Sequence, residues 1–373
     1  MIPFNKPSLT GKEIEYILDA SNTGQLAGDG KYTLLCQEIL KNYTGCKNSL
    51  LTHSCTAALE MCALLADLQP GDEVIMPSYT FVSTANAFCL RGATPVFVDI
   101  RKDTLNLDEK LVKDAITSKT KAVVAVHYAG IACEMDFLAN LCQKYNILFI
   151  EDAAQALGSK YNGKSLGSFG DLATLSFHET KNIISGEGGS LLINNESFTK
   201  QAEIIRAKGT NRTSFDRGET KKYTWHSLGS SFLPGELIAA FLYAQLEHID
   251  SITKKKLDIW KKYYDGLRCI EEKGFVTLPI VPKNCEHNGH LFFILVENQK
   301  KRNELIDFLK SNSIHSVFHY VPLHSSPAGI RYGRCHGSLS ITEDVSSRLI
   351  RLPSWIGMNK TNKIISSILH FYN

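Results

Sequence analysis

Apolar runs of strand length alternate with helix-length segments between Lys47 and about Asn195. The runs are apolar throughout, which is typical of strands that are buried on both faces of a parallel sheet. The runs that predict strands are EVIMPS from Glu73, TPVFVDI from Thr94, KAVVAVHYAG from Lys121, NILFIEDAA from Asn146, LATLSF from Leu172 and GSLLINN from Gly189. Helices are predicted between them, at CTAALEMCALLADL from Cys55 and EMDFLANLCQKY from Glu134. This repeat of strand and helix predicts a layered α/β domain with a mostly parallel sheet.

A polar stretch that contains glycines interrupts this pattern from Gly209 to Ser231. It is too long for a simple connection inside a compact domain, and loops of this length are usually functional or lie at an interface. The segment from Gly235 to Leu267 then has helical periodicity, and we interpret its lysines mostly as a solvated helix face, not as a functional basic patch. These lysines are Lys254, Lys255, Lys256, Lys261 and Lys262.

The C-terminal part of the chain has a different pattern, in which short strands and helices are mixed. FVTLPIV, LFFILVEN and HSVFHYVP predict strands, and KRNELIDFLKSN and TNKIISSILHFY predict helices. This mixture predicts a small α+β domain. We therefore expect two domains, a large α/β domain at residues 1–250 and a small one at residues 251–373.

Composition and charge narrow the class of protein. Hydrophobic residues make up 43% and charged residues 21% of the 373, which is ordinary for a globular protein. A formal net charge of +3 argues against a nucleic-acid surface, which needs a clustered basic field. The ten cysteines are scattered without a CxxC pair, so most are expected to be reduced core residues. No apolar segment predicts a signal peptide or a membrane span, and a cytoplasmic protein that binds small molecules or a second copy of itself is expected.

A carboxylate and an amine follow two of the predicted strands. Asp152 ends the strand NILFIED, and Lys181 follows the strand LATLSF. Ligands of parallel α/β sheets bind outside the carboxyl ends of the strands, so both side chains are expected at one rim. Pyridoxal phosphate (PLP) requires a lysine for its Schiff base and a carboxylate that keeps its pyridine nitrogen protonated. Taken alone, the two residues are weak evidence for PLP, because a structural Asp–Lys ion pair would look the same and is more common.

A candidate phosphate site lies at the start of the helix that begins with Cys55. Free N–H groups at a helix N-terminus bind anions, and Ser54 and Thr56 add hydroxyl groups there. The alternative, that Ser54 or Thr56 is only a helix cap, is equally consistent with the sequence. Ser176, on the strand before Lys181, supplies a further hydroxyl. The glycines of the GEGG segment, Gly186, Gly188 and Gly189, more simply allow a tight turn before the next strand.

Several motifs in fixed order resemble one known family. They are EDAAQ, SFHETKN and GEGG around the aspartate and the lysine, the aromatic segment PSYTFVSTANA, and the C-terminal YVPLH. The chain resembles the sugar aminotransferases of the DegT/DnrJ/EryC1/StrS family over essentially its whole length. This resemblance implies a PLP-dependent transferase of fold type I, the fold of aspartate aminotransferase. It also implies a homodimer whose active sites lie at the subunit interface, and no metal.

The resemblance assigns roles to residues around the cofactor. It implies that Lys181 forms the Schiff base, that Asp152 salt-bridges the pyridinium nitrogen and that Gln155 approaches the phenolic oxygen of PLP. Phe81 matches the position that stacks on the ring, although a core phenylalanine at the end of a strand is the alternative. Around the phosphate it implies contacts from Ser54, Cys55, Thr56 and Ser176, the cysteine through its backbone.

Other positions match the family pattern less fully. Ser231 stands where many members have an asparagine that reaches the phosphate bound by the partner subunit, and Ile238 stands where many have glutamine. His324 and Tyr320, both in YVPLH, are expected to contact the substrate. His178 lies near Lys181, but we interpret it as a packing residue because the released lysine already carries the proton.

The implied reaction is amination of a nucleotide-linked keto-sugar with L-glutamate as donor. Within the family the likeness is greatest to enzymes that aminate dTDP-4-dehydro-6-deoxy-D-glucose at C4 for surface polysaccharides. A C3-aminotransferase, or a C4-aminotransferase of another dTDP- or UDP-linked sugar, is the first alternative. A PLP-dependent sugar dehydratase is less consistent with Lys181, because those relatives carry histidine at that position. A PLP-binding regulator without turnover is less consistent with the presence of both Lys181 and Asp152.

Overall fold

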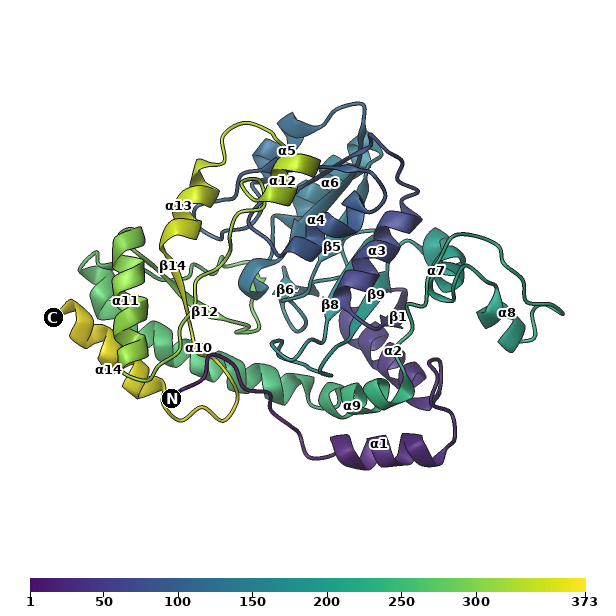
Figure 1. Cartoon of the computed structure of the whole chain (residues 1–373), viewed down its shortest axis with the longest axis horizontal. Helices are drawn as coiled ribbons and strands as arrows, with labels where there is room; N and C mark the ends of the chain where they lie inside the picture. The colour runs from purple at the N-terminus through teal and green to yellow at the C-terminus, as the bar shows by residue number, and fades with distance from the viewer.

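The central element is an eight-stranded, mostly parallel sheet. The computed structural model describes residues 1–373, and Figure 1 shows the sheet in the larger part of the molecule. The strand order is β1-β9-β8-β5-β4-β2-β3-β13, and only β9 runs antiparallel to its neighbours. The strands are β1 (Asn48–Thr52), β2 (Glu73–Pro77), β3 (Thr94–Val98), β4 (Thr120–Val126), β5 (Leu148–Asp152), β8 (Leu172–Ser176), β9 (Gly189–Ile193) and β13 (Arg334–Cys335). The layered α/β fold predicted from the apolar runs is confirmed.

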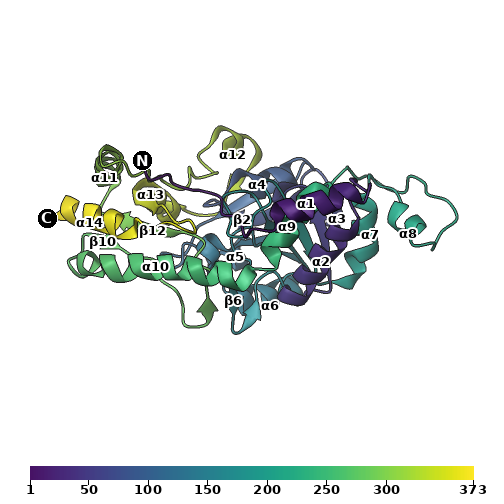
Figure 2. The same ribbon diagram turned by 90° about the horizontal axis from the view of Figure 1, so that it is seen from below.

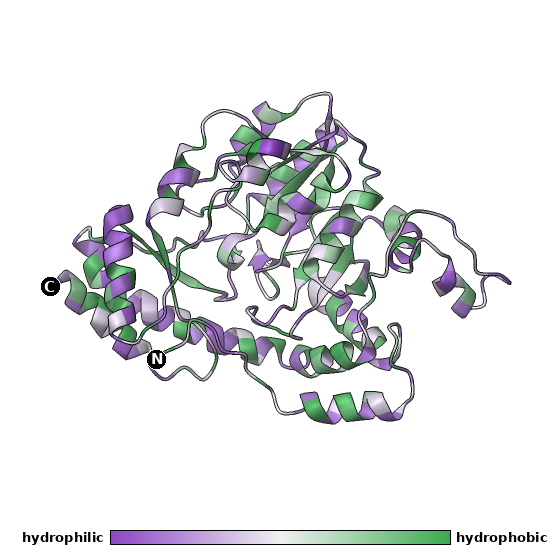
Figure 3. Ribbon diagram, viewed as in Figure 1, coloured by the Kyte–Doolittle hydropathy of each residue, from purple (hydrophilic) through white to green (hydrophobic).

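Helices cover both faces of this sheet, and the two layers of core explain why the strands are apolar throughout. Side chains alternate along a strand, so Ile75 packs into one core and its neighbours Val74 and Met76 into the other. The first core packs against α1 (Glu13–Asn22), α2 (Lys31–Thr44), α5 (Glu109–Ala115), α6 (Met135–Tyr145) and α9 (Glu236–Leu246). The second packs against α3 (Cys55–Leu65), α4 (Val82–Cys89) and α7 (Thr199–Arg206). Figure 3 shows these strands as a largely hydrophobic layer.

A second, smaller unit is built on the long helix α10 (Ile249–Glu272). We call this unit the small lobe and the eight-stranded sheet with its helices the large lobe. The small lobe contains the antiparallel sheet β10-β12-β14 and two further helices. These elements are β10 (Val276–Thr277), β12 (Phe292–Val296), α11 (Gln299–Ser311), β14 (Leu349–Leu352) and α14 (Thr361–Tyr372). The domain boundary that we proposed between residues 250 and 251 falls within the first turn of α10, which begins at Ile249. This boundary stays a prediction.

The two lobes exchange short segments. Ile2 pairs with Ile314 and lies in the core of the small lobe, although it belongs to the N-terminus. In the opposite direction, β13 returns from the C-terminal part of the chain to the edge of the large sheet beside β3. A smaller apolar cluster joins the lobes, with Tyr79 and Tyr128 from one and Phe293 from the other. The lobes are therefore packed together over an apolar seam.

The remaining elements lie at the edges of the lobes. They are η1 (Tyr128–Gly130), β6 (Lys160–Tyr161), β7 (Lys164–Ser165), η2 (Glu196–Phe198), α8 (Arg212–Asp216), β11 (Cys285–Glu286), α12 (Pro327–Tyr332) and α13 (Ser340–Arg348). The stretch from Gly209 to Ser231, which includes α8, extends away from the body of the molecule (Figures 1 and 2). No helix is both long enough and apolar enough to cross a membrane.

Helix α10 confirms the solvated lysine face with one exception. Four of the lysines are exposed, but Lys256 is buried, and its ammonium donates to the carbonyl and the hydroxyl of Ser354 at 2.5 and 3.0 Å. Burial lowers the pKa of Lys256 to about 7. The sequence could not reveal this exception, because the Ser354 segment that covers α10 lies far along the chain.

Candidate active site

A cavity of about 470 Å³ lies where the carboxyl ends of β5 and β8 face the small lobe. Nearly all residues predicted to bind the cofactor contribute to its wall. They are Ser54, Cys55, Thr56, Phe81, Asp152, Gln155, Ser176 and Lys181. Tyr320, which was predicted to contact the substrate, lines the same cavity from the C-terminal part of the chain. The position agrees with the general rule that ligands of parallel sheets bind at the carboxyl ends of the strands.

Lys181 lies in a closed loop between β8 and β9. Backbone bonds hold the loop at its base, where Phe177 donates to the carbonyl of Gly188 and Ser185 donates to the carbonyl of Phe177, at 2.9 and 2.7 Å. Gly186 has a φ of +81°, so it makes the tight turn that the sequence predicted. Burial lowers the pKa of Lys181, and the nearby charge of Arg351 lowers it further. A lowered pKa increases the neutral, nucleophilic fraction of this amine.

Asp152 is buried at the end of β5, and it is held by hydrogen bonds instead of an ion pair. Its Oδ2 accepts from the hydroxyl of Thr84 at 2.7 Å, and its Oδ1 accepts from the backbone of Ala154 at 3.2 Å. Thr84 is in turn 2.8 Å from Thr80. No cation lies within ion-pair distance of Asp152, so the structural Asp–Lys pair considered above is wrong. The carboxylate faces the cavity with no cationic partner, which suits a protonated ring nitrogen.

The N-terminus of α3 forms another part of the wall. Ser54 is the cap of this helix, and its hydroxyl accepts from the backbone of Ala57 at 3.0 Å, so its capping role is confirmed. The hydroxyl of Thr56 pairs with that of Ser83 at 2.8 Å. Burial raises the pKa of Cys55 to about 12, so its thiol stays neutral.

Gly189 sets how closely β9 approaches this helix end. A Cβ at Gly189 would overlap the carbonyl group of Ser54 and the backbone nitrogen of Cys55. The glycine thus serves a close approach of two backbones and not only a turn, a role that the sequence analysis did not assign. The candidate phosphate site at the start of α3, which we call the phosphate cradle, therefore requires a residue without a side chain at position 189.

Gln155 connects the large lobe to Tyr320. Its amide nitrogen donates to the hydroxyl of Tyr320 at 3.0 Å, and its amide oxygen accepts from the backbone of Ala129 at 2.8 Å. Ala129 lies in the turn η1 with a φ of +59°. The orientation of Gln155 is therefore fixed by contacts on both sides.

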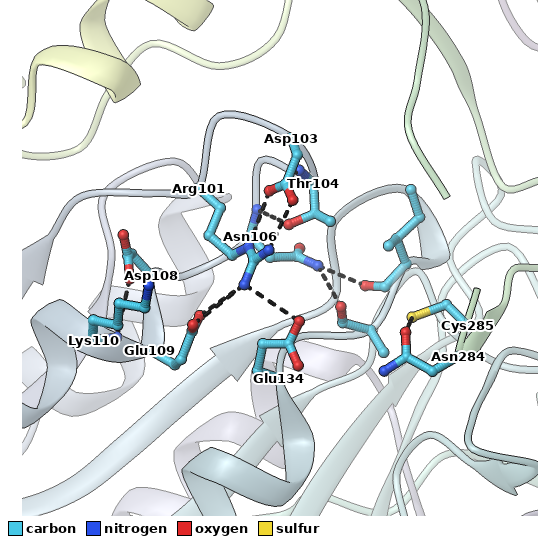
Figure 4. Close-up of polar contacts among 12 residues, drawn as sticks. Arg101, Asp103, Thr104, Asn106, Asp108, Glu109, Lys110, Glu134, Asn284 and Cys285 are labelled. Carbon is cyan, nitrogen blue, oxygen red and sulfur yellow. Dashed lines mark hydrogen bonds and ion pairs between the residues drawn. The ribbon is translucent and has the colours of Figure 1, made fainter. Parts of the chain in front are cut away.

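A polar network outside the cavity supports the turn that contains Ala129. Asn106 donates to the carbonyls of Ile131 and Ala132, each at 2.9 Å, and its oxygen accepts from the backbone of Tyr128 at 2.9 Å. Next to it, Arg101 pairs with the carboxylates of Asp103, Glu109 and Glu134 (Figure 4). These pairs are partly exposed and each contributes little by itself. Together they fix the loop that carries Asn106.

Phe81 lies on the wall of the cavity with 59% of its surface exposed. It precedes the first residue of α4, which turns the ring out of the core. The alternative of a core phenylalanine is therefore wrong. An exposed ring at the mouth of a cavity is available to stack on a planar ligand.

Three predicted positions do not reach the centre of the cavity. His178 lines it with a partly exposed side chain whose Nδ1 lies 2.9 Å from the hydroxyl of Thr180, and its packing role stays a prediction. His324 lies outside the lining, with Nδ1 2.7 Å from Ser78 and Nε2 3.3 Å from Glu343. Ser231 is exposed and pairs with Ala207, also outside the lining. Substrate contact by His324 and cofactor contact by Ser231 stay predictions.

Sequence reasoning missed several residues of the wall. They are Phe4, Ser83, Thr84, His290, His319 and Arg351. Most come from segments that are remote in sequence and meet only when the small lobe packs against the large one. One signal was available, because Arg351 interrupts the apolar run LIRLP, where a charged side chain is unexpected.

The residues present fit pyridoxal phosphate. Lys181 supplies an amine with a lowered pKa, and Asp152 supplies a buried carboxylate without a cationic partner. The helix end at Ser54 to Thr56, opened by Gly189, supplies backbone donors for a phosphate. Phe81 supplies an exposed ring. Each requirement of the cofactor is therefore met by a residue of the cavity wall.

Comparison with known proteins agrees with this geometry. GDP-perosamine synthase of Vibrio cholerae is 32% identical to the chain, with 100% of both chains covered. PseC of Helicobacter pylori, an aminotransferase involved in the biosynthesis of pseudoaminic acid, superposes with a TM-score of 0.90 at 27% identity over 99% of this chain and 98% of its own. A candidate sugar aminotransferase of Streptococcus pneumoniae, solved in a PLP form and a PMP form, superposes with a TM-score of 0.90 at 28% identity. These forms cover 98% of this chain and 97% or more of their own.

The predicted fold type and the predicted cofactor are confirmed by these relatives and by the site itself. The model of the DegT/DnrJ/EryC1/StrS aminotransferase family matches residues 7–369, nearly the whole chain. The chain therefore belongs to the DegT/DnrJ/EryC1/StrS aminotransferase family, and pyridoxal phosphate is its cofactor.

Proposed function

We propose that this enzyme transfers an amino group from L-glutamate to a nucleotide-linked keto-sugar, for the biosynthesis of a surface polysaccharide. The observation that carries the transaminase assignment is that Lys181 and Asp152 line one cavity without pairing to each other. A lysine at position 181 also favours transamination over dehydration of the sugar. The proposed substrate rests on the likeness to relatives and not on a contact in the cavity.

Different residues of the cavity have different roles in the proposed reaction. When bound, pyridoxal phosphate acts as an electron sink for the carbon that carries the amine. Asp152 holds a proton on the ring nitrogen, and its own position is fixed by Thr84. The Nζ of Lys181, free once the substrate amine has taken its place, moves the proton to and from the reacting carbon. Gln155 and Tyr320 close the side of the cavity that faces the small lobe.

The sugar we propose is dTDP-4-dehydro-6-deoxy-D-glucose, aminated at C4 to give dTDP-4-amino-4,6-dideoxy-D-galactose. This choice is supported by stretches that resemble the enzymes acting on this sugar, which include PFNKP, LLTHSCTAALEM, VHYAGIACEMD, KGTNR and VFHYVPLH. Cations for the diphosphate are available in the 209–231 stretch and directly before it. They are the exposed residues Lys208, Arg212, Arg217, Lys221 and Lys222. We further propose a cytoplasmic homodimer with active sites at the subunit interface.

A GDP-linked sugar is the second candidate. Proteins named GDP-perosamine synthase, from Vibrio cholerae and Escherichia coli O157:H7, are 32% and 30% identical to the chain over its full length. A C4-aminotransferase of a GDP-linked keto-sugar would use the same cavity chemistry with a different nucleotide. The choice between the two depends on loops outside the cavity wall.

Incubation with L-glutamate and a panel of dTDP-, UDP- and GDP-linked 4-keto-6-deoxy sugars tests both candidates. We expect the dTDP-sugar to have the highest kcat/KM, and NMR of the product to show an axial amine at C4. An amine at C3, or an equatorial amine at C4, would reject the proposed product. A GDP-sugar preferred by more than about tenfold, or about 1.4 kcal/mol in the barrier, would establish the second candidate.

A further inference from the structure

Arg351 extends from the small lobe into the wall of the active-site cavity. It lies on β14, whose backbone pairs with β12 and, at Arg351 itself, with Val317. The guanidinium lies 4.7 Å from the ring centre of Phe4, and its Nη1 lies 3.2 Å from Nε2 of His319. The side chain is therefore held by an aromatic face and an imidazole.

This guanidinium has no carboxylate partner. Arg351 forms no ion pair, and its Nε is buried without a hydrogen-bond partner. Arg206, which is fully buried, also has an Nε without a partner, but its Nη2 lies 2.6 Å from Oδ1 of Asp29. Arg351 is partly buried, and a charge withdrawn from water without a counter-ion costs free energy, because a guanidinium keeps its charge. The arrangement is explained if the counter-ion is a ligand.

The neighbours of Arg351 do not supply the missing negative charge. A guanidinium can only donate, so Nε2 of His319 must accept, and the proton of His319 lies on Nδ1, 3.2 Å from the hydroxyl of Tyr128. Burial and the charge of Arg351 lower the pKa of His319, which keeps its ring neutral. Burial also lowers the pKa of His290 on the same wall. The only carboxylate of the wall besides Asp152 is Glu187, which lies near His178.

The cavity that Arg351 shares with Lys181 selects the kind of anion. The incoming amine must reach the place of the Lys181 Nζ, and an amino acid carries its carboxylate on the same carbon as that amine. In a 4-keto-sugar nucleotide, the diphosphate hangs from C1, across the ring from the reacting carbon. Arg351 lines the same cavity as Lys181. The short distance between amine and carboxylate in an amino acid suits this arrangement.

We propose that Arg351 binds the α-carboxylate of the amino donor, an inference that rests on the proposed function. His319 orients the guanidinium as a neutral acceptor and leaves its charge for the ligand. Arg351 is then a donor-binding residue and takes no part in binding the sugar nucleotide. Charge-assisted arginine–carboxylate bonds are about twice as strong as neutral ones, so removing the charge should weaken donor binding clearly.

The test compares Arg351→Met and Arg351→Lys in the holoenzyme. Titration with glutarate, an unreactive dicarboxylate, measures donor-site binding without turnover, and titration with dTDP measures nucleotide binding. We expect Arg351→Met to weaken glutarate binding at least about tenfold, Arg351→Lys to restore part of it, and dTDP binding to change less than about twofold. Arg268→Met is the matched control, because Arg268 is exposed on α10 and pairs only with Glu272. It should leave both titrations unchanged.

A second experiment tests which carboxylate of the amino donor Arg351 binds. In the wild type, L-glutamine keeps the α-carboxylate and L-isoglutamine replaces it with an amide. We expect Arg351→Met to slow the single-turnover reaction of L-glutamine at least about tenfold and to leave the already slow reaction of L-isoglutamine nearly unchanged. Thermal unfolding of each variant separates a folding defect from a binding defect.

The outcomes separate this inference from the proposed function. If Arg351→Met binds glutarate as the wild type does, or loses dTDP instead, the inference is wrong while the aminotransferase function stands. If the wild type itself does not bind glutarate, the inference is also wrong. If the wild type binds glutarate in an Arg351-dependent manner but does not react with glutamate and a keto-sugar, the proposed function fails and the carboxylate site remains.

Discussion

Lys181 is the only lysine in the wall of the active-site cavity, so its replacement should remove the covalent attachment of the cofactor. We expect Lys181→Ala to abolish transamination and to leave no cofactor bound to the chain after borohydride reduction. Mass spectrometry of the reduced protein measures this directly. Lys261→Ala, on the exposed face of α10, is the control and should keep both properties. A reduced adduct that persists in Lys181→Ala would contradict the assignment.

Asp152 depends on Thr84 for its orientation, and the two positions can be tested in parallel. We expect Asp152→Asn to lower kcat more than about 100-fold, or about 2.7 kcal/mol, because an amide cannot hold the pyridinium proton. Thr84→Val removes one hydrogen bond to the carboxylate and should cost about 1 kcal/mol, close to fivefold in kcat. Thr84→Ser keeps the hydroxyl and should stay near wild type. Activity of Asp152→Asn within about tenfold of wild type would mean that another group holds the proton.

At the scale of single elements, the contact between β9 and the start of α3 decides the shape of the phosphate cradle. Gly189→Ala places a methyl group against the backbone of Ser54 and Cys55, so the helix end must shift. We expect the affinity for PLP to fall at least about tenfold, measured by cofactor fluorescence on reconstitution of the apoenzyme. Gly235→Ala, where the nearest atom is 3.4 Å away, should bind PLP as the wild type does. Unchanged affinity in Gly189→Ala would show that the phosphate does not bind at this helix end.

Elements were easier to predict from the sequence than the contacts between them. The strands ending at Asp152 and Ser176 follow from their apolar runs, because local pattern determines burial on both faces of a sheet. Lys181 and Asp152 follow from the ends of those strands. Arg351, His319 and Phe4 could not be placed in the same way, because they reach the cavity only through the packing of the small lobe. Periodicity carries no information on which remote segments meet.

At the scale of the whole molecule, the stretch from Gly209 to Ser231 exposes large side chains to solvent. Trp225 is 77% and Leu228 is 58% exposed, which is unfavourable unless a partner covers them. We expect a dimer in sedimentation velocity, and we expect Trp225→Asp to shift it toward monomer with loss of activity. Tyr145→Asp, at an exposed tyrosine on α6, is the control and should stay dimeric. We propose that this stretch crosses to the partner subunit and lines its active site, and an active monomer of the wild type at working concentration would reject this proposal.

The pairing of Ile2 with Ile314 has a consequence for chain connectivity. Ile2 packs in the same core as Ile364 and Ile368 near the C-terminus, and both ends of the chain lie on the same side of the molecule (Figure 1). The N-terminal end of the chain thus completes the core of the small lobe. A circular permutant that joins the two ends and opens the chain at the β6–β7 turn, where Gly163 has open space around it, should keep every contact of the cavity.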